Sequence, residues 1–376
     1  MPDLVAIDLP GGQAFVDTVR RSWDAGNAVF PIDQRLPGPA RQALLAALRP
    51  SAIVASGSIH RRRHGIPVDD GDALVMPTSG STGTPKGVVL THDALHASAR
   101  ATSQRLGVTD ADQWLACLPL AHIGGFSVLT KAWWAGVALT VHDGFDAAAV
   151  TRAAHDGATL VSLVPAALNR IDPALFRVIV LGGSRPPADR PSNTVTTYGM
   201  TETGSGIVYD GRPLDDVEVR IVDSEIVVRG PMLLRCYRDG TSPFDAEGWL
   251  HTSDLGHWLA DGRLHVDGRR GDLIITGGEN VWPDAVEAAL RGHPAVADVA
   301  VAGVADPMWG QRVVAWVVPT TAAAPPSLTD LRNHVGEHHP AFMAPKELVL
   351  VASIPRTALG KVVRSALAND HEPSSG

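Results

Sequence analysis

The sequence predicts an α/β fold with a large N-terminal domain of mostly parallel, covered sheets plus a small antiparallel β part, followed by a small α+β C-terminal domain. Two observations support this prediction. From about residue 40 to residue 200, short apolar runs alternate with helical patterns, which is typical of parallel strands covered by helices. After Gly211 the strand-like segments alternate apolar and polar residues, as half-exposed antiparallel strands do.

Within the first part, each element is predicted from its apolar pattern. Helical spacing is present at residues 41–48 and 92–105. Buried strands are expected where apolar residues run continuously, at 52–55, 73–76, 114–118, 137–141, 160–164 and 178–181. Ligands of open α/β sheets bind beyond the carboxyl ends of the strands, so motifs that follow these runs are candidates for a site.

The second part begins with strands predicted at 217–222 and 225–229, joined by a tight turn at Asp223 and Ser224, and a further strand at 262–268. From about Arg270 a smaller α+β pattern follows. Its helices are expected near 283–291 and 327–339, its strands near 299–304, 313–318 and 348–351, and a Pro/Ala-rich loop at 319–327. We place the domain boundary near Gly271, which gives domains 1–270 and 271–376.

The composition limits the classes of function. The 376 residues are 45% hydrophobic and 19% charged, as expected for a globular chain with a sizeable core. The net charge of −8 argues against a nucleic-acid partner. The one dense basic run, residues 60–64, is interpreted as a solvated loop, with contact to a phosphorylated ligand as the alternative.

The cysteines and the apolar runs indicate the cellular compartment. Cys117 and Cys236 are far apart and show no metal-binding spacing, so both are expected to be reduced structural thiols. No apolar stretch is long enough for a membrane span, and the first residues lack the features of a signal peptide. The sequence therefore predicts a cytoplasmic protein. It leaves the oligomeric state open, with a homodimer as a hypothesis.

A glycine- and hydroxyl-rich loop at residues 78–87 follows the strand predicted at 73–76 and carries one lysine, Lys86. Glycines let a backbone approach an anion closely, and the N–H groups of such a turn form an anion-binding concavity. The loop is not a Walker A motif, because Pro85 precedes the lysine and Gly87 follows it. It predicts a nucleotide-phosphate site of another kind, with an ordinary Gly/Ser surface turn as the alternative.

Four later segments accompany this loop, at 197–203, 248–254, 268–274 with 277–280, and 355–361. The five segments, in this order, resemble the signature motifs of adenylate-forming enzymes, a family that includes acyl- and aryl-CoA ligases, peptide-synthetase adenylation domains and beetle luciferases. Such enzymes activate a carboxylate with ATP, which yields an acyl-adenylate and pyrophosphate. The resemblance implies a mobile C-terminal domain and ATP, Mg²⁺ and coenzyme A as ligands.

The resemblance also implies which residues contact the phosphates. The loop residues would hold the β- and γ-phosphates: Thr78, Ser79, Gly80, Ser81, Thr82, Gly83 and Lys86. Thr201 would contact the α-phosphate, and Glu202 would hold Mg²⁺ together with phosphate oxygens, the usual way of binding this ion. A solvent-facing loop acid is the alternative interpretation of Glu202.

For the nucleoside, the resemblance implies residues from separate segments. Asp254 would accept hydrogen bonds from both ribose hydroxyls, and Arg269 would also reach the ribose. A structural ion pair is the alternative for either residue. The adenine site would contain Tyr198, stacked near the ring, with Gly199 and Met200, and on its other side Gly182, Gly183 and Ser184. The two glycines and the serine could instead form a plain strand-to-turn junction.

Lys361 is the implied catalytic lysine, which would bridge the substrate carboxylate and the α-phosphate during adenylation; a surface lysine is the alternative. In the second step, Gly277 and Gly278 would line a channel for the pantetheine thiol. Gly271 occupies the hinge position, where relatives often carry Asp or Lys. His122 would border the acyl pocket, with a satisfied core histidine as the alternative.

The chain is short for this family, since only 77 residues precede the loop. Compact members include the o-succinylbenzoate–CoA ligases of menaquinone biosynthesis, and residues 198–214 resemble actinobacterial members of that group. The predicted function is therefore an ATP-dependent acid–CoA ligase for o-succinylbenzoate. The alternatives are a CoA ligase for another aromatic or fatty acid, an enzyme that passes the acyl group to an amine or a carrier protein, and a non-catalytic nucleotide-binding protein.

Overall fold

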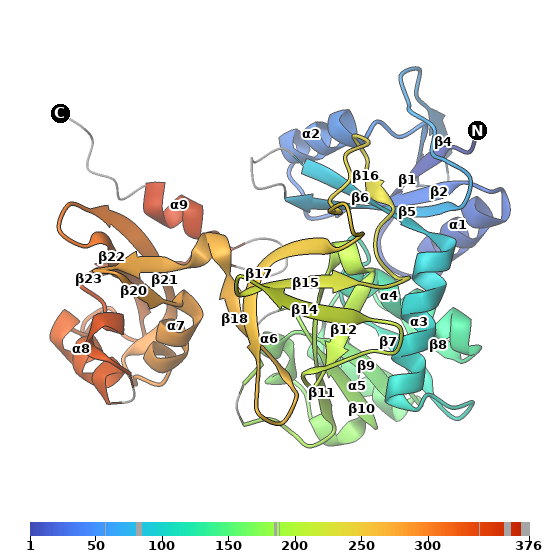
Figure 1. Ribbon diagram of the computed structural model, residues 1–376. Coiled ribbons are helices and arrows are strands. Elements are labelled where there is room, and N and C mark those ends of the chain that lie inside the picture. The colour runs from blue at the N-terminus through green and yellow to red at the C-terminus, as the bar shows by residue number, and fades with distance from the viewer. Residues whose placement is uncertain are drawn as a thin grey trace. The chain divides into compact units, whose positions relative to one another are not determined.

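Figure 1 shows the computed structural model of the chain, which describes residues 1–56, 58–79, 85–183, 186–187, 189–337, 339–356 and 362–369. The chain divides into two compact units. Unit 1 comprises Met1–Arg220, Val227–His251 and Trp258–Leu264, and unit 2 comprises Ile221–Ile226, Thr252–His257 and His265–Gly376.

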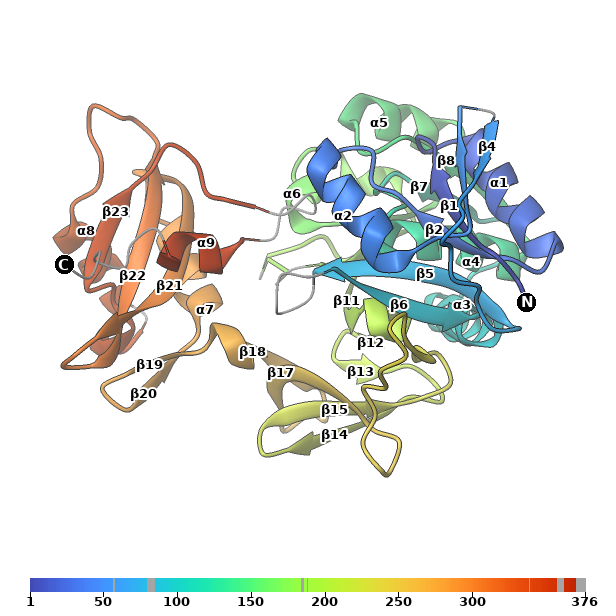
Figure 2. The ribbon, with the colours of Figure 1, turned by 90° about the horizontal axis from the view of Figure 1, so that it is seen from above.

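The first sheet of unit 1 has the strand order β16-β6-β5-β2-β1-β3-β4. Its central strands β5, β2, β1 and β3 are parallel, and the outer pairs are antiparallel. The strands are β1 (Leu4–Asp8), β2 (Ala28–Pro31), β3 (Ala52–Ala55), β4 (Ser58–Arg61), β5 (Asp72–Ser79), β6 (Pro85–Thr91) and β16 (Cys236–Tyr237). Helix α2 (Gly38–Leu48) contacts β6 (Figure 2) and contributes Leu44 and Leu48 to the core of this sheet.

The second sheet of unit 1 has the order β13-β12-β11-β10-β9-β7-β8. It is parallel from β11 to β8, and β12 and β13 extend it antiparallel. The strands are β7 (Gln113–Ala116), β8 (Ala138–Val141), β9 (Leu160–Leu163), β10 (Val178–Leu181), β11 (Thr194–Met200), β12 (Ser205–Tyr209) and β13 (Arg212–Pro213). Both sheets are therefore mixed: their central strands are parallel, as predicted, and antiparallel pairs form their edges.

Two helices lie between these sheets. Helix α3 (His92–Leu106) contacts β5 and β6 of the first sheet and β12 of the second, and helix α4 (Ile123–Ala135) contacts α3 and the second sheet. Helix α3 begins where the Thr91 hydroxyl accepts a hydrogen bond from the Ala94 N–H, and it ends at Gly107 in the left-handed conformation. The remaining helices of unit 1 are α1 (Gln13–Asp24), α5 (Ala147–His155), α6 (Pro165–Leu168), η1 (Pro173–Leu175) and η2 (Thr201–Thr203).

A further sheet has the order β14-β15-β17-β18, and its residues are divided between the two units. The strands are β14 (Glu218–Val222), β15 (Glu225–Arg229), β17 (Leu250–Trp258) and β18 (Leu264–Arg269). Asp223 and Ser224 have φ angles of 48° and 66°, which is the geometry of the tight hairpin turn predicted at these residues.

Unit 2 is built on a sheet with the path β20-β19-β22-β21, to which β23 adds beside β22. The strands are β19 (Ile274–Thr276), β20 (Glu279–Val281), β21 (Val296–Asp306), β22 (Gly310–Pro319) and β23 (Glu347–Leu350). The helical segments are η3 (Arg270–Asp272), α7 (Pro283–Arg291), α8 (Leu328–Gly336), η4 (Ala341–Met343) and α9 (Arg364–Asn369). One face of the sheet packs on α7 and α8, and α9 lies beside β21 (Figure 2).

Several local predictions can be compared with these elements. The α/β class and the helix at 283–291 are confirmed, whereas the helix expected at 327–339 begins after its N-cap Ser327 and ends at Gly336. Strand β6 was not predicted, because Pro85 and Gly87 suggested only a loop. The basic run at 60–64 is exposed, as expected of a solvated segment, and Cys117 and Cys236 are free thiols. In the described part of the chain, no helix is long and apolar enough to cross a membrane.

Candidate active site

The segment predicted to bind phosphate connects the two strands of an antiparallel hairpin. Strands β5 and β6 pair Thr78 with Lys86, so these two residues lie opposite each other next to the connecting loop. The strand predicted before the loop is confirmed, and the chain returns as a second strand after it. Gly80, Ser81, Thr82 and Gly83 lie outside the described residues, and only the backbone of Ser79 is described.

A tyrosine links the lysine of the hairpin to the carboxylate that is predicted to hold the metal. The Tyr237 hydroxyl on β16 donates a hydrogen bond to Glu202 Oε1 at 3.2 Å, and Lys86 Nζ lies 4.9 Å from the centre of the Tyr237 ring. Strand β16 pairs with β6, which brings Tyr237 to this position. Tyr237 therefore contacts both Lys86 and Glu202, and the sequence analysis did not identify it as a candidate site residue.

The turn that carries Thr201 and Glu202 is fixed by Thr203. This side chain is fully buried, and its hydroxyl accepts a hydrogen bond from the Met200 N–H at 2.9 Å and lies 2.6 Å from the Ser205 carbonyl oxygen. The short helix η2 follows β11 directly, so Tyr198, Gly199 and Met200 form the end of that strand. Thr201 and Glu202 are accordingly held at the carboxyl end of β11, a strand that the sequence analysis did not predict.

The segments predicted on the two sides of adenine meet in the structure. Gly182 follows β10, and a Cβ atom at this residue would lie 2.7 Å from Thr197 Oγ1, next to Tyr198. Glycine is therefore required here by the close approach of β11. Gly183 has a φ angle of 85°, and Ser184 lies outside the described residues.

His122 lies at the N-terminus of α4 and is bonded to two residues that follow β2. Its Nε2 is 3.1 Å from Asp33 Oδ2 and 3.3 Å from Arg35 Nη2. Burial lowers the pKa of His122 against the opposing charge of Asp33, so the imidazole is neutral at pH 7. Burial opposes ionisation of Asp33, but the hydrogen bonds and charge of Arg35 outweigh it and hold the Asp33 pKa at about 2. His122 is thus a satisfied, half-buried histidine, and its partners were not predicted.

Lys131 is a further feature that the sequence analysis did not predict. It lies in the middle of α4 with only 2% of its surface exposed, and its Nζ donates to Ser127 Oγ at 3.2 Å and to Ser205 Oγ at 2.9 Å. Burial lowers the Lys131 pKa to about 8. In the described part of the chain its hydrogen-bond partners are hydroxyls and not carboxylates. The signal in the sequence is a lysine within the otherwise apolar run 123–135.

Unit 2 holds the predicted ribose and thiol residues. Arg269 Nε lies 3.6 Å from Asp254 Oδ1, so the two residues implied for the ribose are neighbours. Gly277 and Gly278, with φ angles of 60° and 86°, form the turn between β19 and β20. The Gly277 N–H donates to the carbonyl oxygen of Trp309, a residue whose exposed fraction is 42%. Lys361 lies outside the described residues.

These residue types fit a nucleotide with magnesium. Lys86 and the hydroxyl of Thr201 suit phosphate oxygens, and Glu202 supplies one carboxylate. Among the described residues no group of three or more His, Cys, Asp or Glu side chains is arranged to hold a metal ion. A single carboxylate is sufficient for Mg²⁺, since this ion is commonly bound by one or two carboxylates plus substrate phosphates.

Comparison with known families agrees with this arrangement. The family model described as AMP-binding enzyme matches residues 61–238, and that of the AMP-binding enzyme C-terminal domain matches residues 285–361. The chain belongs to the AMP-binding enzyme family, the adenylate-forming enzymes that its motifs resemble.

Individual relatives extend this result. The chain is 42% identical to the "Probable 2-succinylbenzoate–CoA ligase" of Mycobacterium tuberculosis, over 88% of this chain and 93% of the relative. The o-succinylbenzoate CoA synthetase (MenE) of Bacillus subtilis in complex with the acyl-adenylate intermediate OSB-AMP is similar with a TM-score of 0.87 and 30% identity, covering 97% and 88% of the two chains. The same enzyme in complex with ATP and a magnesium ion gives 0.85 and 29%, covering 97% and 89%.

Proposed function

We propose that this chain is an AMP-forming acid–CoA ligase that activates 2-succinylbenzoate with ATP and then forms its CoA thioester. The class of reaction is supported by the family and by Tyr237, which contacts both Lys86 and Glu202, with Thr201 next to Glu202 in the chain. The substrate is supported by the name of the M. tuberculosis relative, by the intermediate bound in the B. subtilis enzyme, and by one feature of this chain, Lys131. The product is the thioester expected in menaquinone biosynthesis.

Lys131 supports the substrate assignment because it is a buried cation whose hydrogen-bond partners, among the described residues, are hydroxyls and not carboxylates. Burying an ammonium among neutral groups is costly, so such a residue calls for a counter-charge. 2-Succinylbenzoate has two carboxylates, of which only one becomes an adenylate, and the other remains anionic throughout the reaction. Lys131 donates a hydrogen bond to Ser205, which follows Glu202 by three residues, so Lys131 lies close in space to the turn that carries Thr201 and Glu202. We assign it to the second carboxylate.

In the first half-reaction, a carboxylate oxygen of the acid bonds to the α-phosphorus of ATP. The bond from this phosphorus to the bridging oxygen breaks, and pyrophosphate leaves with its electron pair. Lys86 and the hairpin loop hold the departing phosphates, Thr201 contacts the α-phosphate, and Lys361 stabilises the charge that develops between carboxylate and phosphate. Magnesium, when bound, neutralises phosphate charge, and Glu202 is its protein ligand.

In the second half-reaction, the sulfur of coenzyme A bonds to the acyl carbon and AMP leaves as the thiol loses its proton. We assign the pantetheine channel to Gly277 and Gly278 and the ribose contacts to Asp254 and Arg269. The domain of residues 271–376 changes its orientation between the two steps. We assign the hinge to Gly271. A Cβ atom at this residue would meet no atom within 4 Å, so packing does not require a glycine here. The conformational freedom of a glycine backbone is therefore our explanation for this residue at the hinge.

A substrate panel tests this function. With ATP and Mg²⁺, 2-succinylbenzoate should support the fastest pyrophosphate release. The kcat/KM for benzoate, succinate and a fatty acid should be at least about 100-fold lower, because these acids cannot place a second carboxylate at Lys131 in the same way. With coenzyme A, mass spectrometry should find the thioester. Release without thioester would favour an amine or carrier protein as acceptor, and no release with any acid would contradict an enzymatic role.

Tyr237→Phe tests the link between Lys86 and Glu202. The variant keeps the ring and removes the hydroxyl that bonds Glu202, a hydrogen bond to a charged group worth roughly 1.5–3 kcal/mol. The Mg²⁺ concentration for half-maximal pyrophosphate release, and the Kd of MgATP measured by calorimetry, should both rise about tenfold. Arg312→Ala, which breaks an ion pair with Glu347 in unit 2, is the control and should leave both values unchanged. Unchanged values for Tyr237→Phe would show that this bond does not orient Glu202.

A further inference from the structure

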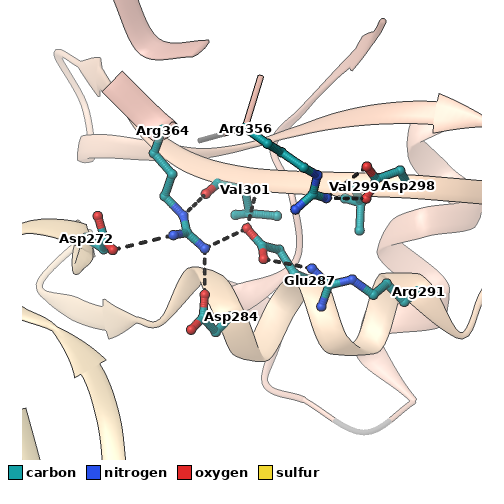
Figure 3. A network of polar contacts seen from close by, with 9 residues as sticks. All are labelled: Asp272, Asp284, Glu287, Arg291, Asp298, Val299, Val301, Arg356 and Arg364. Atoms are coloured by element: carbon teal, nitrogen blue, oxygen red, sulfur yellow. Dashed lines mark hydrogen bonds and ion pairs between the residues drawn. The ribbon is translucent and has the colours of Figure 1, made fainter. Parts of the chain in front are cut away.

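One arginine after the predicted catalytic lysine joins four parts of unit 2 (Figure 3). Arg364 Nη2 lies 2.5 Å from Asp284 Oδ1 and 2.8 Å from Glu287 Oε1, both on α7. Its Nη1 lies 3.4 Å from Asp272 in η3, and its Nε donates to the Val301 carbonyl oxygen at 3.0 Å. The Arg364 side chain is 12% exposed and that of Glu287 is 4% exposed, so this is a largely buried network.

The network also occupies the edge of a sheet. Strand β21 ends the order β20-β19-β22-β21, so its outer backbone groups have no neighbouring strand in that path. At Val301, Glu287 Oε1 accepts from the N–H at 2.9 Å while Arg364 donates to the C=O. The ion pair thus takes the place of a partner strand at one residue and fixes the start of α9 to a definite position along β21.

A second arginine fixes the chain on the other side of residues 357–361. Arg356 Nη2 lies 2.7 and 2.8 Å from the two carboxylate oxygens of Asp298, at the beginning of β21 (Figure 3). Arg356 and Val362 form an antiparallel bridge, and the Val363 N–H donates to the Pro355 carbonyl oxygen at 2.9 Å. Both ends of the stretch that contains Lys361 are therefore attached to the same strand.

We propose that Arg364 is a positioning residue for adenylation: by fixing the chain three residues after Lys361 to β21, α7 and η3, it sets where unit 2 presents that lysine. This inference rests on the proposed role of Lys361. Buried ion pairs contribute little net stability compared with apolar residues of similar size, but they favour one geometry. The Arg364 network is therefore better explained by positioning than by stability. A catalytic group misplaced by about 1 Å can lose about 100-fold in rate.

The half-reactions of Arg364→Ala test the proposal. The kcat of pyrophosphate release should fall about 100-fold, because Lys361 is misplaced. The KM for ATP should stay within about threefold of wild type, because ATP binding does not depend on Arg364. Thioester formation from preformed adenylate should stay within about twofold to threefold of wild type, because that step does not use Lys361. Arg312→Ala, which breaks an Arg312–Glu347 pair of 2.7 Å elsewhere in unit 2, is the control and should change neither half-reaction.

A double-mutant cycle separates positioning from stability. In a Lys361→Ala background, Arg364→Ala should cause no further loss of adenylation, because it acts through the lysine. Multiplied losses, or equal losses of both half-reactions, would overturn the proposal. If Arg364→Ala does not fold, Glu287→Gln replaces it, because glutamine keeps the shape of the side chain and the oxygen that accepts from Val301. This variant should show a smaller but equally selective loss of adenylation rate. An adenylation rate that does not fall selectively would overturn the proposal. Wild-type protein that releases no pyrophosphate would instead refute the proposed function.

Discussion

The Lys361→Ala variant is expected to form acyl-adenylate about 100- to 1,000-fold more slowly than the wild type, the usual effect of removing one preorganised charge-stabilising group. The lysine is needed while the carboxylate attacks the α-phosphate, because negative charge accumulates between the two reactants at that moment. In the proposed mechanism it is not needed when the thiol attacks the finished adenylate, since the domain of residues 271–376 would then present Gly277 and Gly278 in its place.

Rapid-quench measurement of pyrophosphate release, and of thioester formed from synthetic adenylate, separates the two steps. The first rate should fall and the second should stay close to wild type. Arg312→Ala serves again as a control that removes a charge from the same unit and should affect neither rate. If Lys361→Ala slows both steps equally, the assignment of this residue to adenylation is wrong.

The Lys131→Met variant is expected to be more stable and much less active than the wild type. The pKa of about 8 lies below the ordinary lysine value of 10.5, so the unfolded state binds more protons between these pH values. The stability of the wild type should therefore rise as the pH increases from about 8 to 10.5, and the cost of the buried charge is complete below pH 8. That cost corresponds to roughly 3 kcal/mol.

Thermal denaturation at pH 7 and at pH 10 measures this effect. Lys131→Met should raise the Tm at pH 7, and the gain should shrink at pH 10, where the wild-type lysine is largely neutral. The serines can bond each other in the variant, because Ser127 Oγ and Ser205 Oγ are 3.3 Å apart. An equal change of Tm at both pH values would mean that the effect is one of packing and not of charge.

The same variant should lose catalytic efficiency selectively. With 2-succinylbenzoate, kcat/KM should fall about 100-fold or more, as expected when one partner of a buried charge pair is removed. The low activity with benzoate should not change, because benzoate has no second carboxylate. Ser127→Ala is the control, because it removes one neutral partner of Lys131 and leaves the charge. It should change the ratio of the kcat/KM values for 2-succinylbenzoate and benzoate only slightly. Equal losses for both acids would refute the assignment of Lys131.

The sequence predicted the parts of this protein that are contiguous in the chain. Residues 197–203 contain Tyr198, Thr201 and Glu202 within seven positions, so this motif was recognised without a structure, although strand β11 that leads into it was not predicted. Strand β10 and the helix α7 followed from uninterrupted apolar or helical patterns. Strand β6 was not predicted because Pro85 and Gly87, near its beginning, are poor strand formers. They are accommodated because β6 forms one side of a hairpin with β5.

Contacts between distant parts of the chain could not be predicted in this way. Lys131 meets Ser205 across 74 positions, and His122 meets Asp33 across 89. Tyr237 reaches Glu202 because β16 adds to the edge of the first sheet, a pairing of only two residues on each strand. Each of these contacts depends on the register of sheets and helices that no local pattern specifies.

A single-turnover experiment tests the central claim, adenylation followed by thioester formation, most directly. Enzyme in excess of 2-succinylbenzoate is mixed with MgATP in the absence of coenzyme A, quenched and assayed for acyl-adenylate and pyrophosphate; coenzyme A is then added to a parallel sample. We expect adenylate and pyrophosphate in equal amounts before the addition, and conversion of the adenylate to AMP and the CoA thioester after it. Formation of ADP, or thioester without a preceding adenylate, would contradict the account.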